Sequence, residues 1–255
     1  IPIINKDKKI VDLFVLDDNI SSKSYENTAV LMVGGLGTRL RPLTNEIPKP
    51  MLEIGGKPIL LTIVEGLVKS GFTNLIMCLG YKSNVIKDFF KSGSEFGVKI
   101  EYIIEDKKMG TVGALTLLKQ RPKEAFFVMN GDLLTNFNYE QMLEFHHSHG
   151  SKATMCVREY DFQIPYGVVN INNEDIISIK EKPIHSCFVN AGIYLLEPEC
   201  IDFIPNDEFY DMPTLIEKII ASKLKVVSFP VREYWLDVGR MDEFNKANQD
   251  IELLK

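Results

Sequence analysis

Short apolar runs alternate with longer amphipathic stretches along most of the chain, which is the pattern of an α/β domain. This pattern predicts strands at residues 30–33, 75–79, 100–104 and 125–129, and helices at residues 59–70, 85–91 and 112–119. Further apolar runs predict shorter strands joined by tight turns at residues 153–157, 168–171, 176–180 and 189–195. We therefore predict a Rossmann-like sheet, mixed but mostly parallel and flanked by helices, with ligands at the carboxyl ends of its strands. The shorter strands are expected to extend this sheet along one side of the cleft.

Composition narrows the class of protein. The 255 residues are 45% hydrophobic, which is enough for a substantial core. No apolar run approaches the roughly 18 residues of a membrane span, so no membrane partner is expected. A net charge of −6 argues against general nucleic-acid binding. The four cysteines are widely spaced and form no CxxC motif, which disfavours a zinc site or a disulfide framework and fits a reducing cytoplasm.

The stretch VLMVGGLGTRLRPLTNEIPKP at residues 30–50 combines an apolar strand, a glycine turn and two cations. Glycines after a strand let the backbone approach a bound group and direct its N–H groups at phosphate oxygens. Arg39 and Lys49 add charge-assisted hydrogen bonds to a polyphosphate. The segment therefore predicts a nucleoside triphosphate site. Its expected nucleotide contacts are Val33, Gly34, Gly35, Gly37 and Thr38.

Two better-known phosphate motifs do not fit this segment. A Walker A loop needs four residues before a Gly-Lys-Ser/Thr ending, and Arg39 with Leu40 replaces the third glycine of the dinucleotide fingerprint. A glycine turn of no special function remains an alternative for Gly-Gly-x-Gly alone. With Arg39, Pro-Leu-Thr at residues 42–44 and Pro-Lys-Pro at residues 48–50 attached, the block resembles the signature of the sugar-1-phosphate nucleotidylyltransferases, also called NDP-sugar pyrophosphorylases. The resemblance runs from about residue 27 to the C-terminus.

Two aspartates follow apolar runs at separate places in the chain. Asp132 ends Val-Met-Asn-Gly-Asp, and Asp237 lies in Tyr-Trp-Leu-Asp-Val-Gly. Carboxylates at two strand ends can hold Mg²⁺, which takes phosphate oxygens and water as its other ligands. Each aspartate alone is more typical of a turn. The resemblance implies that both bind Mg²⁺, the expected cofactor, and that Asp132 also contacts the nucleotide.

The acceptor side is expected from two further segments. As a bare pattern, Lys-Glu-Lys-Pro at residues 180–183 is a solvated charged turn. The resemblance implies that Lys182 binds the sugar phosphate, and that Glu181 and Asn190 contact sugar hydroxyls. Gly167 is expected to bring a backbone N–H towards the sugar.

The resemblance also implies the reaction. An oxygen of the sugar 1-phosphate attacks the α-phosphorus in line and pyrophosphate leaves, which depends on positioning and charge neutralisation. Arg39, Lys49 and Lys182 are the expected catalytic residues.

Residues 104–114, IEDKKMGTVGA, are expected to line the base pocket through Glu105, Gly110 and Thr111. A carboxylate only accepts hydrogen bonds, and guanine offers adjacent N1–H and N2–H donors that Glu105 can accept together. Thymidylyl and uridylyl members of the family usually carry glutamine at this position. The sequence therefore favours GTP, with UTP, dTTP and CTP as alternatives, while a surface strand end is the non-functional interpretation of Glu105.

The N-terminal segment bears on the sugar. Residues 1–18 are expected to form two short strands around a polar turn at residues 5–8, and residues 21–27 a polar linker. The segment is similar to the closing half of a CBS repeat, so we divide the chain into a CBS remnant with linker at 1–24 and a nucleotidyltransferase domain at 27–255. A simple extension packed on the main domain is the alternative. A CBS module before this domain resembles the glucosamine-1-phosphate guanylyltransferases of legionaminic acid biosynthesis, which favours glucosamine 1-phosphate over mannose or heptose 1-phosphate.

Two rival functions differ in what they require. A non-catalytic, regulatory subunit that binds nucleotide sugar would be expected to lose Lys182, Asp132 or Asp237, and all three are present. A dehydrogenase would need the third glycine of the dinucleotide fingerprint, and this chain has Arg39 and Leu40 there instead. A homo-oligomer is expected on base rates alone.

Overall fold

The computed structural model describes residues 2–4, 10–13 and 23–251. Strands β1 (Pro2–Ile4) and β2 (Ile10–Leu13) pair antiparallel, as the sequence predicts. The polar turn at residues 5–8 and most of the proposed linker lie outside the described residues, so the CBS remnant remains a prediction. The predicted end of the linker at residue 27 is wrong, because strand β3 already begins at Tyr25.

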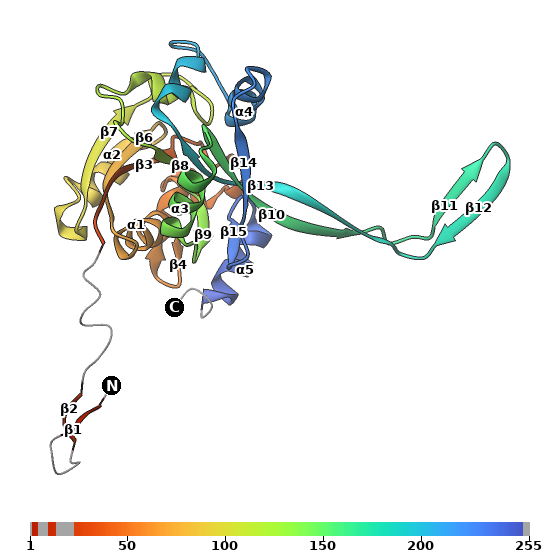
Figure 1. Cartoon of the computed structure of the whole chain (residues 1–255), viewed down its shortest axis with the longest axis horizontal. Helices are drawn as coiled ribbons and strands as arrows, with labels where there is room; N and C mark the ends of the chain where they lie inside the picture. The colour runs from red at the N-terminus through yellow and green to blue at the C-terminus, as the bar shows by residue number, and fades with distance from the viewer. Residues whose placement is uncertain (1, 5–9, 14–22, 252–255) are drawn as a thin grey trace.

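A seven-stranded sheet forms the centre of the molecule (Figure 1). Every neighbouring pair in it is parallel except the two pairs made by β13, which runs antiparallel to β10 and β8. The predicted mixed, mostly parallel sheet is therefore confirmed. In sheet order, the strands are β14 (Val226–Pro230), β10 (Ala153–Gln163), β13 (Ile184–Leu196), β8 (Phe126–Asn130), β3 (Tyr25–Val33), β6 (Phe72–Leu79) and β7 (Lys99–Ile104).

Helices cover both faces of the sheet because alternate strand residues point to opposite sides. On β3, Leu31 packs in a cluster with α1 and α3, whereas Val30 packs in a second cluster with α4. The burial pattern of α1 follows the helical period, with Ile59, Ile63 and Leu67 buried. The α-helices are α1 (Ile59–Lys69), α2 (Ser83–Phe90), α3 (Tyr139–His149), α4 (Met212–Ala221) and α5 (Met241–Gln249).

The helix predicted at residues 112–119 is wrong, because these residues form a short 3₁₀ helix, η6 (Gly113–Leu117). Its hydrogen bonds follow the tighter spacing, with Leu115 N donating to Val112 O at 3.0 Å. The Thr116 hydroxyl also donates to Gly113 O at 2.8 Å, which competes with the α-helical pattern. The remaining 3₁₀ segments are η2 (Thr38–Leu40), η3 (Leu43–Asn45), η4 (Lys49–Met51), η5 (Ser94–Phe96) and η7 (Pro198–Phe203).

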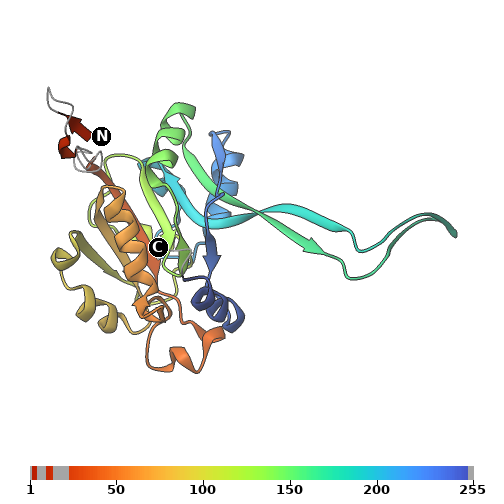
Figure 2. The ribbon, with the colours of Figure 1, turned by 90° about the horizontal axis from the view of Figure 1, so that it is seen from below.

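The second half of the chain departs most from the predicted pattern. Strands β10 and β13 are far longer than the runs at residues 153–157 and 189–195, because polar residues such as Glu159 and Ser186 continue the ladder. Between them, β11 (Val168–Asn172) and β12 (Asp175–Lys180) form a separate two-stranded sheet. Figures 1 and 2 show this hairpin held far from the body on a two-stranded stem. Residues 153–157 and 189–195 therefore extend the central sheet as predicted, whereas β11 and β12 do not join it.

Two small sheets complete the body. Strand β9 (Leu133–Thr135) pairs antiparallel with β15 (Trp235–Asp237), and β4 (Glu53–Ile54) pairs with β5 (Lys57–Pro58). In the first of these pairs Leu133 lies opposite Asp237. This register places the chain just after β8 beside the chain just after β15.

Candidate active site

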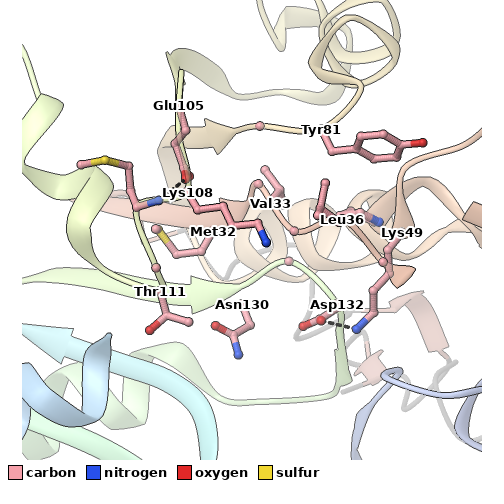
Figure 3. Close-up of a pocket in the computed structure, with 18 of the residues that line it drawn as sticks. Met32, Val33, Leu36, Lys49, Tyr81, Glu105, Lys108, Thr111, Asn130 and Asp132 are labelled. Carbon is pink, nitrogen blue, oxygen red and sulfur yellow. Dashed lines mark hydrogen bonds and ion pairs between the residues drawn. The ribbon is translucent and has the colours of Figure 1, made fainter. Parts of the chain in front are cut away.

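A pocket of about 680 Å³ opens at the carboxyl ends of β3, β7 and β8 (Figure 3). This is the edge at which α/β sheets bind ligands, and the volume suits a nucleotide. The pocket contains every donor-side residue predicted from the sequence. These residues are Val33, Gly34, Gly35, Gly37, Thr38, Arg39, Lys49, Glu105, Gly110, Thr111 and Asp132.

The glycine turn forms one wall of the pocket, and its shape depends on Gly37. Gly37 has a φ of +61°, a left-handed conformation that side chains rarely adopt. The Thr44 hydroxyl donates a 2.8 Å hydrogen bond to Gly37 O and holds this conformation. A Cβ at Gly37 would lie 2.9 Å from Thr44 Cγ2. Nothing lies within 4 Å of a Cβ added at Gly35, so a ligand can approach the backbone there.

Lys49 lies at the floor of the site between the two predicted metal-binding aspartates. Its side chain is only 10% exposed, and Nζ makes an ion pair with Asp132 Oδ2 (Figure 3). The same Nζ lies 3.7 Å from Asp237 Oδ1. The β9–β15 pairing brings the two carboxylates together, with Val238 N donating to Asp132 O at 3.1 Å. Asp132 and Asp237, which lie 83 and 188 positions after Lys49 in the sequence, are thus brought to a single ammonium group.

The two aspartates fit a divalent cation. Asp132 Oδ1 and Asp237 Oδ1 are buried and accept no hydrogen bond. Burial raises the pKa of Asp237, the neighbouring Asp132 carboxylate raises it further, and Lys49 opposes both effects. Two carboxylate oxygens that accept no hydrogen bond, beside a phosphate pocket, match Mg²⁺, which completes its shell with waters and phosphate oxygens. Within residues 23–251, no group of three or more His, Cys, Asp or Glu side chains is arranged to hold a metal by itself.

Glu105 closes the opposite end of the pocket, at the end of β7. Its backbone N–H donates to Leu79 O at 2.8 Å, which fixes it beside β6. The carboxylate lies over Gly34, where an added Cβ would come within 2.8 Å of Glu105 Oε1. Met109 N donates to Glu105 Oε2 at 3.4 Å. Burial raises the pKa of Glu105 and this backbone hydrogen bond lowers it. One face of the carboxylate is therefore held by the protein while the other remains available to a ligand.

Four charged residues of the pocket were not named as predicted contacts: Asp106, Lys107 and Lys108, which lie in the segment expected to line the base pocket, and Asp211. Lys108 extends into the pocket (Figure 3), and within the described chain no ion pair involves it, whereas Lys107 pairs with Asp207 at 2.8 Å. Asp211 accepts hydrogen bonds from Thr111 N at 3.0 Å and from the Thr111 hydroxyl at 3.3 Å. The predicted base-pocket segment already includes Lys108, whereas no local signal in the sequence marked Asp211.

The structure does not bring the predicted acceptor residues to this pocket. Gly167, Glu181 and Lys182 are exposed on the stem-borne hairpin, far from the body (Figure 1). They do lie together, since a Cβ added at Gly167 would be 3.0 Å from Glu181 Oε2. Asn190 lies on β13 at the root of the stem, where its Oδ1 accepts from Gly192 N at 2.9 Å. Within one chain, the structure therefore does not gather the predicted acceptor residues around one sugar at this pocket. Their role in binding the sugar phosphate remains a prediction.

Comparison with known proteins decides the family. Residues 28–253 match the family model described as "Nucleotidyl transferase". The chain belongs to this family. Its curated relatives include the mannose-1-phosphate guanyltransferases of Kluyveromyces lactis and Saccharomyces cerevisiae, 35% and 34% identical over 228 residues. These alignments cover 84% of this chain and 62% of each relative, so the chain spans about three fifths of their length.

Solved structures share the fold of this chain. HddC from Yersinia pseudotuberculosis is 29% identical, with a TM-score of 0.66 over 88% of this chain and 99% of that one. A structure of HddC complexed with GMP-PN gives the same score at 28% identity. A Bacillus anthracis protein described as a glucose-1-phosphate thymidylyltransferase is 24% identical, and its TM-score of 0.71 supports the fold alone. The predicted fold class is thereby confirmed. In the described part of this nucleotidyl transferase family member, no helix has the length and apolar character needed to cross a membrane.

Proposed function

We propose that this nucleotidyl transferase family member transfers a nucleotidyl group from a nucleoside triphosphate to a sugar 1-phosphate and releases pyrophosphate. One observation carries the proposal. The glycine turn, Lys49 and Asp132 line one pocket at the carboxyl ends of the sheet, and Asp237 lies beside it, with Oδ1 3.7 Å from Lys49 Nζ. This set matches what in-line transfer at a phosphate requires, namely donors to phosphate oxygens, a cation at the reacting phosphorus and carboxylates for a metal.

The chain's own residues take distinct parts in the reaction. An oxygen of the acceptor phosphate attacks the α-phosphorus, and the bond from that phosphorus to the pyrophosphate oxygen breaks. Arg39 and the backbone N–H groups of the glycine turn hold the departing pyrophosphate. Lys49, held in place by Asp132, stabilises the charge that develops at the α-phosphate. Mg²⁺ bound by Asp132 and Asp237 would supply further neutralisation of phosphate charge.

GTP is the proposed donor. The half-buried Glu105 presents a carboxylate at the pocket end opposite Lys49, where it can accept from guanine N1–H and N2–H together. The raised pKa of Glu105 reflects a partly dehydrated carboxylate, in which such hydrogen bonds are strong. The curated relatives are named guanyltransferases, and a related structure is complexed with GMP-PN, which supports the same base. UTP, dTTP and CTP remain the alternatives to be compared.

Two acceptors are favoured by different observations. Resemblance of the N-terminal segment to a CBS repeat favours glucosamine 1-phosphate and GDP-glucosamine, with legionaminic acid biosynthesis as the setting. The names of the curated relatives favour mannose 1-phosphate. A non-catalytic regulatory subunit is the alternative of another class, and the gathering of Asp132 and Asp237 around Lys49 argues against it.

The test is a grid of pyrophosphate release with Mg²⁺. GTP, UTP, dTTP, CTP and ATP are each paired with glucosamine, N-acetylglucosamine, mannose and glucose 1-phosphate. We expect turnover with GTP and one hexose 1-phosphate, and its loss in Asp132→Asn. The matched control is Asp88→Asn, because Asp88 is an exposed carboxylate on α2 outside the pocket lining. Nucleotide binding without turnover in any cell of the grid would instead support the regulatory subunit.

A further inference from the structure

Residues 158–190, here called the arm, comprise the outer parts of β10 and β13 and the hairpin β11–β12. The arm leaves the body as a two-stranded stem, and Figures 1 and 2 show from two directions that beyond its root it lies against no other described part of the chain. The stem is a regular ladder, paired from Arg158 opposite Val189 to Gln163 opposite Ile184. Six residues at roughly 3.3 Å each carry the hairpin about 20 Å outward. Isolated two-stranded ribbons are marginally stable in water, so the arm is expected to have a partner.

The root of the stem fixes the direction of the arm. The Arg158 guanidinium donates to Val231 O at 2.9 Å and to Glu233 O at 3.0 Å. On the facing strand, Trp235 Nε1 donates to Ala191 O at 2.9 Å. Further out, Gln163 Nε2 donates to Lys182 O at 3.1 Å, so the ribbon is held together up to the hairpin. Folding the arm back over its own pocket would require these root contacts to break.

The hairpin has one face built like the face of a buried sheet. In its register, Val169 lies opposite Ile179, and Ile171 lies opposite Ile176. The three isoleucines are 62–64% exposed. The opposite face carries a hydrogen-bonded polar pair, with Asn170 Nδ2 donating to Ser178 Oγ at 2.8 Å. Apolar and polar pairs thus alternate along the hairpin, apart from a register shift between Asn170 and Ile171 that leaves the exposed Ile177 without a partner in the ladder. An exposed apolar face of this kind is expected of strands that cover an apolar surface.

The body carries the complementary surface. The pocket lip includes Leu36 and Phe209, which are 39% and 59% exposed. Among the described residues that line the pocket, four cations are matched by four carboxylates: Arg39, Lys49, Lys107 and Lys108 against Glu105, Asp106, Asp132 and Asp211. An acceptor phosphate brings roughly −1.5 to −2 further charges beside the triphosphate. The pocket therefore lacks a cover for its apolar lip, and its lining carries no excess of cations over carboxylates to offset this added charge.

The arm holds what the pocket lacks. Lys182 lies at the base of the hairpin, next to the neighbouring pair Gly167 and Glu181. We propose that two copies of this chain exchange arms, so that the arm of each copy covers the pocket of the other and supplies Lys182 to the acceptor phosphate. The isoleucine face then packs on the apolar lip around Phe209. Because each chain carries both surfaces, the arrangement is self-complementary and closes as a two-fold dimer. This inference rests on the proposed function for the role of Lys182, and on the arm alone for the dimer.

Complementation in a mixed dimer tests the exchange. Lys182→Ala and Lys49→Ala chains carrying different tags are co-expressed, and the mixed dimer is isolated by two affinity steps. Exchange leaves one of its two sites with an intact pocket and an intact arm, so about half of wild-type activity is expected. Each pure variant dimer is expected to be nearly inactive. A mixed dimer as inactive as the pure variants, or full activity in pure Lys182→Ala, would overturn the proposal.

A second measurement does not depend on catalysis. We expect the wild-type chain to have the mass of a dimer in sedimentation, and the double variant Ile176→Ser, Ile179→Ser to have the mass of a monomer that still binds GTP. The matched control is Ile220→Ser, since Ile220 is 55% exposed on α4 and lies outside the arm and the pocket lining. A wild-type monomer, or a dimer that survives the double substitution, would overturn the arm exchange. A dimer lost in the double variant, with no turnover in the wild type, would instead refute the proposed function alone.

Discussion

Replacing Lys49 by methionine removes the ammonium group between Asp132 and Asp237 while keeping the length of the side chain. Loss of one partner of a fully buried ion pair costs about 3–5 kcal/mol. Here the lysine is 10% exposed, but the aspartates are 25% and 47% exposed, so water screens part of the loss. We therefore expect the free energy of unfolding to fall by about 1–2 kcal/mol at neutral pH. For a chain of this size, that corresponds to a melting temperature lower by roughly 2–8 °C.

The pH dependence of this loss follows from Asp237. Burial and the Asp132 carboxylate raise the pKa of Asp237, and Lys49 is the main group that lowers it. Removal of Lys49 therefore raises the pKa of Asp237 further. A carboxylate with a raised folded-state pKa binds its proton more tightly in the folded chain, and stability then falls as the pH rises through that window. The deficit of Lys49→Met is therefore full at neutral pH and shrinks on acidification. Added Mg²⁺ is also expected to reduce it, because the metal replaces the missing positive charge.

Thermal unfolding across pH, with EDTA or Mg²⁺, measures these effects, and steady-state kinetics measures the catalytic loss. Removal of one charge-stabilising contact from a desolvated site is expected to lower kcat by roughly 10²–10³-fold. Lys57→Met is the control, because Lys57 makes an exposed ion pair with Glu65 at 2.6 Å outside the pocket lining. Unchanged stability at neutral pH together with kcat within a few-fold of wild type would refute the role given to Lys49.

Three further predictions concern the base, the metal and the glycine turn. Glu105→Gln should lower the ratio of kcat/KM for GTP to that for UTP, because a bidentate base contact is worth about 1–3 kcal/mol of discrimination; an unchanged ratio would remove Glu105 from base recognition. Because its pKa is raised, Asp237 gains a proton as the pH falls, so the Mg²⁺ concentration for half-maximal activity should rise on acidification. Asp237→Asn should need more Mg²⁺ at every pH, and its Mg²⁺ requirement should depend less on pH. A variant that behaves like the wild type would contradict the metal assignment. Gly37→Ala should destabilise the fold by about 1–2 kcal/mol and raise the KM for GTP, since φ is +61° there; Gly56→Ala, at φ +79° outside the pocket lining, should lose stability without the change in KM.

The first half of the domain was predictable because its chemistry is local in sequence. The strand at residues 30–33 ends in the glycine turn, and a carboxylate follows each of two later apolar runs. Parallel strands bring their carboxyl ends to a common edge, so the meeting of Asp132 with the turn followed from topology. The approach of Asp237 depends instead on the β9–β15 pairing, for which the family resemblance was the only guide.

The arm was not predictable from apolar runs. Polar residues occupy many positions of its stem, so the apolar run that predicted β10 ends at residue 157. In the structure, pairing with β13 extends β10 to Gln163. The alternation of Val169 and Ile171 was visible in the sequence and correctly predicted a strand. The distance of the hairpin from the body could not be predicted, because it depends on long-range strand pairing and on root contacts such as those of Arg158. Asp211 was missed because the fold brings a separate loop, far from residues 104–114 in the sequence, to the pocket.

The fate of the α-phosphate tests the central claim most directly. The chain is incubated with Mg²⁺, a hexose 1-phosphate and GTP labelled at the α-phosphate, and in parallel with GTP labelled at the γ-phosphate. Nucleotidyl transfer predicts that the α-label appears in a GDP-sugar and the γ-label in pyrophosphate, with both lost in Asp132→Asn. Labelled γ-phosphate released as inorganic phosphate, or an α-label that remains in GTP with every acceptor, would contradict the account.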